Sequence, residues 1–446
     1  MTNSNFPRAE KARMRKSSSN QSQTTLVPYH RQWAPRQGKE QLKKRGRWRR
    51  RWLATCCLMT LIAALVASQG NGEVGAWAAD AFRATFGPTL TAQVESWYLG
   101  LSDSAHLLQY QLNGKHVASP WTVKPTSTPT TASSSSSTPI VPTVLPMSLP
   151  SMLPTITPSI AGEGAWMVQN TALPPHTNLP IVAKAFIRPD PSHPYAFVTL
   201  LQFDPRFSLL HMVAGISQPG GPIGKSGTGG IPATDQNGNS LLAVLNGGFK
   251  YADGHYGMAS MGTVYVPPQA GAATLAVTKE GKVVLGVWGV DPLLTSTNTD
   301  LAAWRQNAAL LIDNGVINPL TQDGAAWGGT ILNRAYTWRS GIGITAQNTL
   351  VYAAGDTLTA QTLAEALRSA GAVMAMQTDI NPYWVRAFFY QRLSNGTLSI
   401  AKLYPAMQGS GNEYLYKTEQ RDFFYFTRVA ATPQPLRHAA SHGLSQ

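Results

Sequence analysis

The stretch that decides the fold runs from Trp338 to Trp384 and begins Trp338-Arg-Ser-Gly-Ile-Gly-Ile-Thr-Ala346. Ile342 and Ile344 alternate with small residues, and this period of two predicts a short strand. Residues 349–354, Thr-Leu-Val-Tyr-Ala-Ala, are rich in strand formers and follow a polar turn. We therefore expect them to form the antiparallel partner of the first strand.

A helix and a third strand complete this unit. Thr359 can cap a helix whose apolar residues share one face, and Gly371 can end it; these apolar residues are Leu363, Ala366, Leu367 and Ala370. The next run, Ala372-Val-Met-Ala-Met-Gln-Thr-Asp379, predicts a buried strand that places Asp379 at its carboxyl end. Arg339 lies at the start of this unit and Asp379 at its end. This pair of opposite charges is the first candidate for a functional site.

The basic character of the chain belongs to its N-terminal tail. The 446 residues carry a formal net charge of +14, and residues 1–51 contain 15 of the 36 Lys and Arg residues with only two of the 22 acids. The remaining residues are nearly neutral, which argues against a nucleic-acid partner for the folded part. We expect the tail to be disordered and cytoplasmic.

An uncharged apolar run follows the tail directly. Residues 52–68 predict a single transmembrane anchor, and the dense positive charge before them predicts a cytoplasmic N-terminus and an extracytoplasmic C-terminal domain at the cell membrane. A cleavable signal peptide is the alternative, because residues 64–68 supply small residues for a cleavage site. Both cysteines, Cys56 and Cys57, lie inside this run, so the exported part can form no intrachain disulfide.

Composition divides the rest of the chain. Residues 72–118 have apolar residues at helical spacing and predict a juxtamembrane helical segment, which Gly87-Pro88 divides. Residues 119–164 are rich in Ser, Thr and Pro and predict an extended linker or stalk. A folded domain is expected at 165–429 and a disordered tail at 430–446.

The folded domain is predicted to be α+β, with a mixed, largely antiparallel sheet and few helices. Turn residues separate short strand patterns at 196–203, 241–245, 263–266, 274–277, 283–290 and 310–312. Hairpin turns are expected at 279–282 and 313–315, where Gly or Asn accepts positive φ. A weaker helix pattern covers residues 300–307.

Several short motifs do not indicate a cofactor or metal site. Gly220-Gly-Pro-Ile-Gly-Lys-Ser226 has proline before it where a phosphate-binding loop needs its first glycine, and no helix pattern follows. The chain has no His-Glu-x-x-His motif and no cysteine pair outside the apolar run. We therefore predict no metal and no cofactor.

A second candidate feature follows the buried strand pattern at 241–245. Asn246-Gly-Gly-Phe249 could let backbone amides of Gly247 and Gly248 approach a ligand, with Asn246 as donor and acceptor. A tight turn with no ligand explains the same residues. The next loop carries His255, which is a candidate general acid or base, or an ordinary exposed histidine.

These pieces occur in an order that resembles the phosphodiester glycosidase family, over roughly residues 240–400. The resemblance is carried by Asn246-Gly-Gly-Phe249, by Arg339-Ser-Gly-Ile-Gly343, and by the strand–helix–strand unit that ends at Asp379. It implies hydrolysis of a sugar 1-phosphodiester at the anomeric carbon, in glycans of the envelope or exopolysaccharide. The family includes the enzyme that uncovers mannose 6-phosphate on lysosomal proteins and bacterial exopolysaccharide-associated relatives.

The resemblance also implies roles for the matching residues. Asp379 would be the catalytic carboxylate, and Arg339 would bind the phosphate through its bidentate fork. Asn246, Gly247, Gly248 and Asn381 would contact substrate, and Tyr383 and Trp384 could stack on a sugar or pack in the core.

The chain departs from the family directly after Asp379. The family has a Gly-Gly-Gly-Ser sequence there, whereas this chain continues Ile380-Asn-Pro-Tyr-Trp384. Bulk at Ile380 and the missing N–H of Pro382 change how backbone can approach a substrate. The alternative to an enzyme is therefore a non-catalytic glycan-binding or scaffolding module on the same fold.

Overall fold

The computed structural model describes residues 81, 84, 85, 87–121, 144–173, 178–221, 223–236, 240–328, 336–380, 382–393 and 395–429. The tails expected at 1–51 and 430–446 and the anchor expected at 52–68 lie outside these residues. Within the described residues, no helix is both long enough and apolar enough to cross a membrane. Helix α3 (Pro88–Leu112) begins at the proline that follows Gly87.

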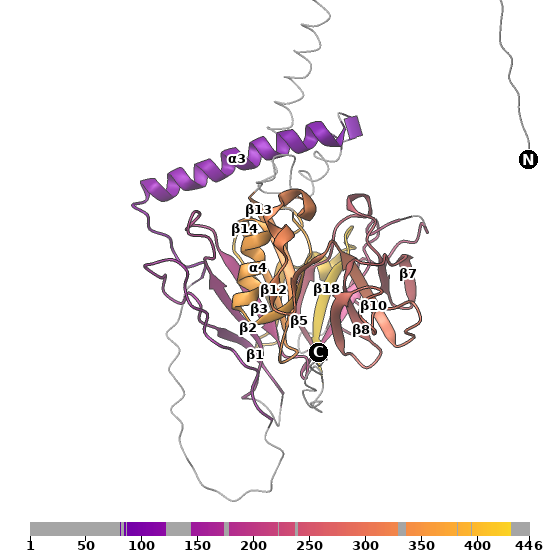
Figure 1. The fold of residues 1–446 in the computed structure, drawn as a ribbon. Helices are drawn as coiled ribbons and strands as arrows, with labels where there is room; N and C mark the ends of the chain where they lie inside the picture. Colours follow the sequence, from indigo (N-terminus) through magenta and orange to yellow (C-terminus); the bar gives the residue numbers. More distant parts are fainter. Residues whose placement is uncertain are drawn as a thin grey trace, which may run out of the picture. The chain divides into compact units, whose positions relative to one another are not determined.

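Three antiparallel sheets build the domain (Figure 1). Sheet A has the order β1 (Met167–Thr171), β2 (Pro180–Ile187), β3 (Val198–Phe203), β14 (Leu350–Leu358), β13 (Thr337–Thr345), β15 (Ala372–Gln377), β11 (Leu310–Asp313), β12 (Val316–Ile317). Sheet B has the order β17 (Leu398–Lys402), β16 (Ala387–Arg392), β5 (Leu241–Asn246), β18 (Phe423–Arg428), β4 (Ser208–Val213). Sheet C has the order β7 (Thr263–Val266), β6 (Met258–Ser260), β10 (Leu301–Asn307), β8 (Ala273–Thr278), β9 (Val283–Val287).

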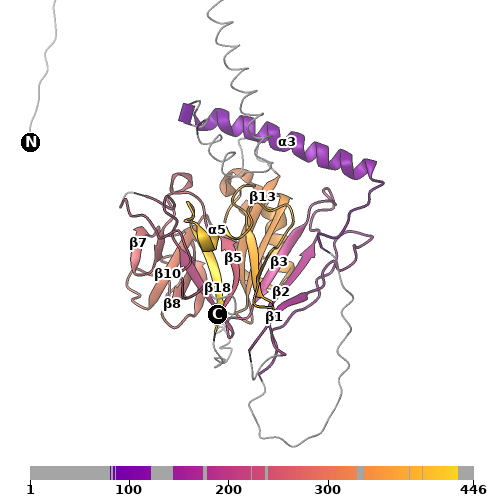
Figure 2. The same cartoon turned by 180° about the vertical axis from the view of Figure 1, so that it is seen from behind.

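Helices are few, as the α+β prediction requires. Besides α3, the described residues contain α4 (Ala360–Ser369), α5 (Glu413–Tyr416) and three short 3₁₀ helices, η2 (Tyr251–Asp253), η3 (Pro319–Gln322) and η4 (Gly324–Trp327). Figures 1 and 2 show β5 and β18 between β1–β3 on one side and β7, β8 and β10 on the other.

The unit predicted from Trp338 onward is confirmed. Strand β13 pairs with both β14 and β15, and α4 connects β14 to β15. Thr359 caps α4 by accepting the Thr362 amide, and Thr362 returns the bond to the Thr359 amide. Gly371 follows the helix with φ 92°, the left-handed conformation that glycine adopts without a Cβ penalty.

Sheet A separates two apolar layers because its residues alternate between faces. Ile342 and Ile344 pack toward sheets B and C, in a cluster that includes Leu245 and Phe426. The opposite face packs on α4 through a second cluster, which includes Leu363 and Leu367. Gly341 and Gly343 belong to that face of β13, and the missing side chain of Gly341 lets Leu363 and Leu367 of α4 approach the strand closely.

One predicted element is wrong. Residues 300–307, expected as a weak helix, form strand β10, which pairs with β6 and β8. Pairing on both sides overrides the local helix preference, because a central strand satisfies all its backbone groups in the sheet. The strand also buries Arg305 completely.

Part of the range expected as linker packs against the folded domain. Residues 144–164 have no regular secondary structure, yet Met147 and Met152 are buried there. Glu163 forms a buried ion pair with Arg188 of the same domain, with 2.8 Å between Oε2 and Nη2. The hairpins expected at 279–282 and 313–315 connect β8 to β9 and β11 to β12, with Asn314 at φ 47° and Gly315 at φ 79°.

We predict that Gly341→Ala destabilises the domain by about 1–3 kcal/mol, the usual cost of overpacking. A Cβ at this position would lie 2.9 Å from the Met376 carbonyl oxygen and 3.2 Å from Leu367 Cδ1. Urea unfolding measures the change. Gly230→Ala, outside the helices and strands, is the control, since its Cβ would meet only the Lys417 carbonyl oxygen at 3.9 Å. If both variants unfold like wild type, the close packing of α4 on β13 is not a constraint.

Candidate active site

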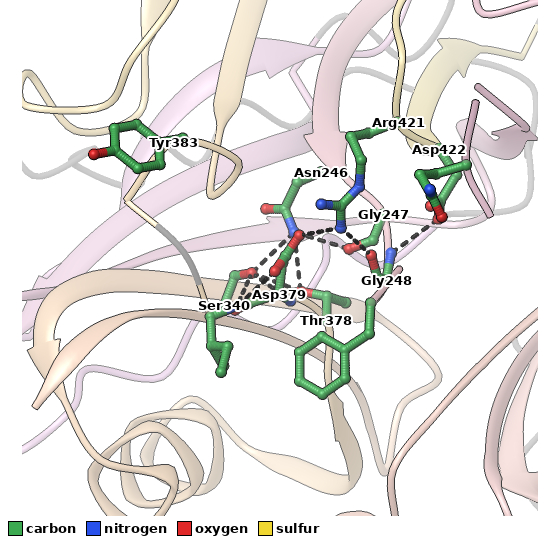
Figure 3. A network of polar contacts seen from close by, with 12 residues as sticks. Asn246, Gly247, Gly248, Ser340, Thr378, Asp379, Tyr383, Arg421 and Asp422 are labelled. Atoms are coloured by element: carbon green, nitrogen blue, oxygen red, sulfur yellow. Dashed lines mark hydrogen bonds and ion pairs between the residues drawn. The ribbon is translucent and has the colours of Figure 1, made fainter. Parts of the chain in front are cut away.

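The candidate site lies where sheets A and B meet, and Asn246 joins them (Figure 3). Asn246 is the last residue of β5, and its side-chain amide donates to Ser340 Oγ of β13 at 3.0 Å and to the Gly247 carbonyl at 2.9 Å. Its Oδ1 accepts the Tyr352 hydroxyl of β14 at 2.6 Å. The amide is buried and its donor and acceptor sides are both occupied by protein groups, so Asn246 positions the site's wall.

Asp379 is fixed by a continuation of the β13–β15 ladder. The Ser340 amide donates to the Asp379 carbonyl at 2.9 Å, and the Thr378 amide donates to the Ser340 carbonyl at 2.8 Å. Ser340 Oγ also accepts the Asp379 amide at 3.1 Å. The backbone of residues 378 and 379 is thus hydrogen-bonded to Ser340 of β13, a strand inside sheet A, so the sheet fixes the position of the Asp379 carboxylate.

Arg421 supplies the cation for Asp379. Its Nη2 donates to Asp379 Oδ2 at 2.7 Å and to the Gly248 carbonyl at 2.8 Å. The Ile380 amide donates to the other carboxylate oxygen at 2.8 Å. Arg421 lies two residues before β18, far from the stretch that carries the sequence motifs, and no local pattern marked it.

The environment of Asp379 favours the protonated carboxyl. Burial raises its pKa above the usual range, and the nearby carboxylates Asp422 and Asp253 act in the same direction. The Arg421 guanidinium and the Ile380 amide oppose this shift without cancelling it. A raised pKa makes the ionised carboxylate a stronger base than that of an exposed aspartate, so Asp379 is suited to accept a proton.

Gly247 and Gly248 make room for a second ion pair. A Cβ on Gly247 would lie 2.1 Å from Asp422 Oδ2, and one on Gly248 would lie 2.9 Å from the Arg305 guanidinium carbon. The Gly248 amide donates to Asp422 Oδ2 at 2.9 Å. A side chain at either position would collide with this ion pair, so the two glycines allow the tight turn to pack against it.

The Arg305–Asp422 pair ties sheet C to sheet B. Arg305 Nε donates to Asp422 Oδ2 at 2.8 Å, and Nη2 donates to Oδ1 at 3.2 Å. The remaining donors reach the carbonyls of Gln306 at 2.9 Å and Phe249 at 2.5 Å. The pair is completely enclosed and satisfied, and it sets the position of Arg421, the neighbour of Asp422 in the chain.

The structure does not bring Arg339 to Asp379. Arg339 donates to the Leu358 and Trp327 carbonyls at 3.0 and 3.1 Å, and to Gln377 Oε1 at 2.9 Å. Its side chain belongs to the α4 face of β13, whereas its neighbour Ser340 faces Asn246. Burial lowers the pKa of Arg339 to about 10. The physical reason is the alternation of the strand, which sends successive side chains to opposite faces.

The other predicted residues lie in different surroundings. His255 is exposed after η2, with φ 57°, and its ring lies 4.5 Å from that of Tyr251. Asn381 lies outside the described residues. Tyr383 lies apart from the Asp379 cluster (Figure 3).

A small cavity of about 10 Å³ adjoins the carboxylate, with Asp379, Trp384, Glu419 and Arg421 among its lining residues. The guanidinium carbon of Arg421 lies 5.2 Å from the centre of the Trp384 ring, and that of Arg386 lies 5.1 Å from it. Trp384 therefore packs over the arginines rather than in the apolar core. Among the described residues, no cluster of three or more His, Cys, Asp or Glu side chains could hold a metal ion.

We predict that Arg305→Met destabilises the domain by about 3–5 kcal/mol, because it leaves Asp422 buried without its counter-ion. The double variant Arg305→Met/Asp422→Leu should recover a large part of that loss, since it removes both charges. Urea unfolding of the two single variants and the double variant measures the coupling. Losses that simply add would show that the two side chains do not act as a pair.

The pKa of Asp379 predicts a pH dependence of stability. A carboxyl whose folded pKa lies above its unfolded value contributes stability that is complete below about pH 4. This contribution is lost as the pH rises through the folded pKa. The unfolding free energy of wild type relative to Asp379→Asn should therefore decrease from pH 4 to pH 7. A difference that increases with pH would show that the Arg421 ion pair outweighs burial.

Comparison with known proteins agrees with the motifs of this site. Residues 239–379 match the family model described as phosphodiester glycosidase. No curated protein matches the chain. The solved catalytic domain of zebrafish N-acetylglucosamine-1-phosphodiester alpha-N-acetylglucosaminidase, auto-inhibited by its pro-peptide, aligns at 14% identity and TM-score 0.36, covering 59% of this chain and 88% of that one. A hypothetical protein from Synechocystis aligns at 12% identity and TM-score 0.34, covering 59% and 68%. Residues 239–379, which include β5 and end at Asp379, thus match the phosphodiester glycosidase model.

Proposed function

We propose that the folded domain hydrolyses the glycosidic C–O bond of a sugar 1-phosphodiester. The observation that carries the proposal is the Asp379 carboxylate, which ends the family match and is held by Arg421 beside Asn246. The side chain of Asp379 is mostly buried and retains 7% of its surface exposed, so only a small part of it is accessible to solvent.

The chemistry of the substrate suits this arrangement. A phosphodiester that leaves the anomeric carbon departs as a stable phosphate monoester, so protonation of the leaving group is less critical than in ordinary glycoside hydrolysis. The site then needs a carboxylate to activate water or to stabilise positive charge at the sugar. Asp379 fills this role, and the raised pKa of its carboxyl brings proton transfer closer to neutral pH.

The remaining predicted residues take supporting roles in this proposal. Asn246, Gly247 and Gly248 form the wall that positions the carboxylate and Arg421. Arg339 braces the opposite side of β13 through Gln377. His255, exposed after η2, is the candidate general acid or base, and Asn381 is the candidate substrate contact.

We further propose that the domain works outside the cytoplasm on an envelope or exopolysaccharide glycan. The concentration of positive charge in residues 1–51, directly before the apolar run at 52–68, supports a single anchor with a cytoplasmic N-terminus. The Ser/Thr/Pro-rich segment after it would let the domain reach a substrate away from the membrane.

A non-catalytic glycan-binding module is the second candidate, and the structure contains one observation that favours it. The cavity beside Asp379 measures only about 10 Å³, and Trp384 lines it. A cavity of this size cannot enclose a sugar ring, so a bound sugar would lie outside it. Glycan binding without turnover, across a panel of sugar 1-phosphodiesters, would favour this second function.

The enzymatic proposal predicts that purified protein releases free sugar from glycosyl 1-(methyl phosphate) diesters. Asp379→Asn should lower the rate by roughly 100- to 10,000-fold, the contribution of a general base, while circular dichroism shows an intact fold. Glu280→Gln, at an exposed hairpin turn, is the control and should keep the wild-type rate. Full activity of Asp379→Asn would overturn the assignment of the carboxylate.

A further inference from the structure

Two hydrogen-bond donors in the candidate site have no partner in the described structure. They are Trp384 Nε1 and Arg421 Nε, and both atoms are buried. Arg421 as a whole is only 8% exposed, and both residues line the cavity beside Asp379. A buried donor without an acceptor costs about 1–3 kcal/mol, so two such donors at one cavity indicate an occupant that accepts hydrogen bonds.

The size of the cavity restricts this occupant. A volume of about 10 Å³ is at the lower limit for one water molecule and is too small for a phosphate group. The lining carboxyl groups of Asp379, Glu419 and Asp422 each face an arginine, namely Arg421, Arg386 and Arg305. These arginines are already engaged with carboxylates, so the cavity offers no free positive charge to hold an anion.

A water molecule satisfies every requirement of the cavity. It can accept one hydrogen bond from Trp384 Nε1 and one from Arg421 Nε, and it can donate its two protons to carboxylates. Nε and Nη2 belong to the same guanidinium group of Arg421, and Nη2 donates to Asp379 Oδ2 at 2.7 Å. A water on Nε is therefore adjacent to the Asp379 carboxylate.

We infer that Asp379, Arg421 and Trp384 bind the water molecule that attacks the anomeric carbon, with Asp379 as its general base. This inference rests on the proposed function. Arg421 and Trp384 contact the reacting water, so both are assigned to the catalytic machinery. Residue 379 is the last residue of the family match, so the region after it, which holds Trp384 and Arg421, is not covered by that match.

The reaction is a single displacement. A lone pair of the water oxygen forms the new C–O bond, and Asp379 takes one proton from that water. The bond between the anomeric carbon and the phosphate oxygen breaks, and its electron pair leaves with the phosphate monoester. The products are a free sugar and a phosphate monoester, and Asp379 then releases its proton to solvent. One displacement inverts the anomeric configuration.

The binding of the water is tested by high-resolution crystal structures of the wild-type protein and Trp384→Phe. We expect one ordered water within hydrogen-bond distance of Trp384 Nε1 and Arg421 Nε, and we expect Trp384→Phe to lose it, because the variant keeps the ring but removes the N–H. An empty cavity, or a water that contacts neither atom, overturns the inference. Trp166→Phe is the matched control, because it removes an indole N–H bond to the Pro150 carbonyl elsewhere in the domain.

The catalytic role is tested by kinetics on the glycosyl 1-(methyl phosphate) that wild type hydrolyses best. Trp384→Phe should lower kcat at least tenfold with little change in KM, Arg421→Lys should lower kcat further, and Trp166→Phe should match wild type. Proton NMR should show the inverted anomer as the first product. A retained anomer, or a Trp384→Phe variant with wild-type kcat, overturns the catalytic role. Wild-type protein that hydrolyses no phosphodiester overturns the proposed function instead, and the crystal structures then decide the water site alone.

Discussion

The ion pair between Arg305 and Asp422 is the interaction on which the rest of the site depends. Arg305 comes from the central strand of sheet C, and Asp422 directly precedes β18 of sheet B, so the pair joins two sheets in the interior. Several backbone groups also bind this pair, including the Gly248 amide and the Phe249 carbonyl. A buried pair of this kind is tolerated only when each charge is fully hydrogen-bonded, and this requirement explains the two small residues at 247 and 248.

A polar seam continues from that pair between sheets A and B. Asn246 binds side chains of β13 and β14, and Arg421 binds Asp379 after β15. Apolar layers enclose this seam, so its hydrogen bonds are strong and an unsatisfied member is costly. Trp384 Nε1 and Arg421 Nε are therefore unusual, because these two buried donors have no partner while the neighbouring polar side chains of the seam do.

The seam also explains how a rigid fold can present a reactive carboxylate. The backbone of Asp379 belongs to the β13–β15 ladder, while its side chain reaches a cavity that borders solvent. Burial raises the pKa of the carboxyl, and Arg421 keeps it oriented. The segment after Asp379 places the indole of Trp384 over two arginines. In our proposal this segment helps to hold the attacking water.

The sequence by itself determined the local architecture around Trp338–Trp384. Periodicity and caps are properties of neighbouring residues, so strands β13, β14 and β15 and the Thr359 cap of α4 could be predicted from them. The order of motifs also indicated the family and the candidate carboxylate Asp379. The alternation of side chains along β13 also determined the orientation of Arg339. It places Arg339 on the same face as Gly341 and Gly343, opposite Ile342.

Only the tertiary structure decided which charges meet. Arg305 lies in a segment with a helical pattern that two neighbouring strands convert into β10, and Arg421 and Asp422 lie in a loop without a recognisable motif. Their partners are separated from them by 42 to 117 positions along the chain. Pairing at such distances is set by how three sheets pack, and by the high free-energy cost of a buried charge without a counter-ion, which no local pattern encodes.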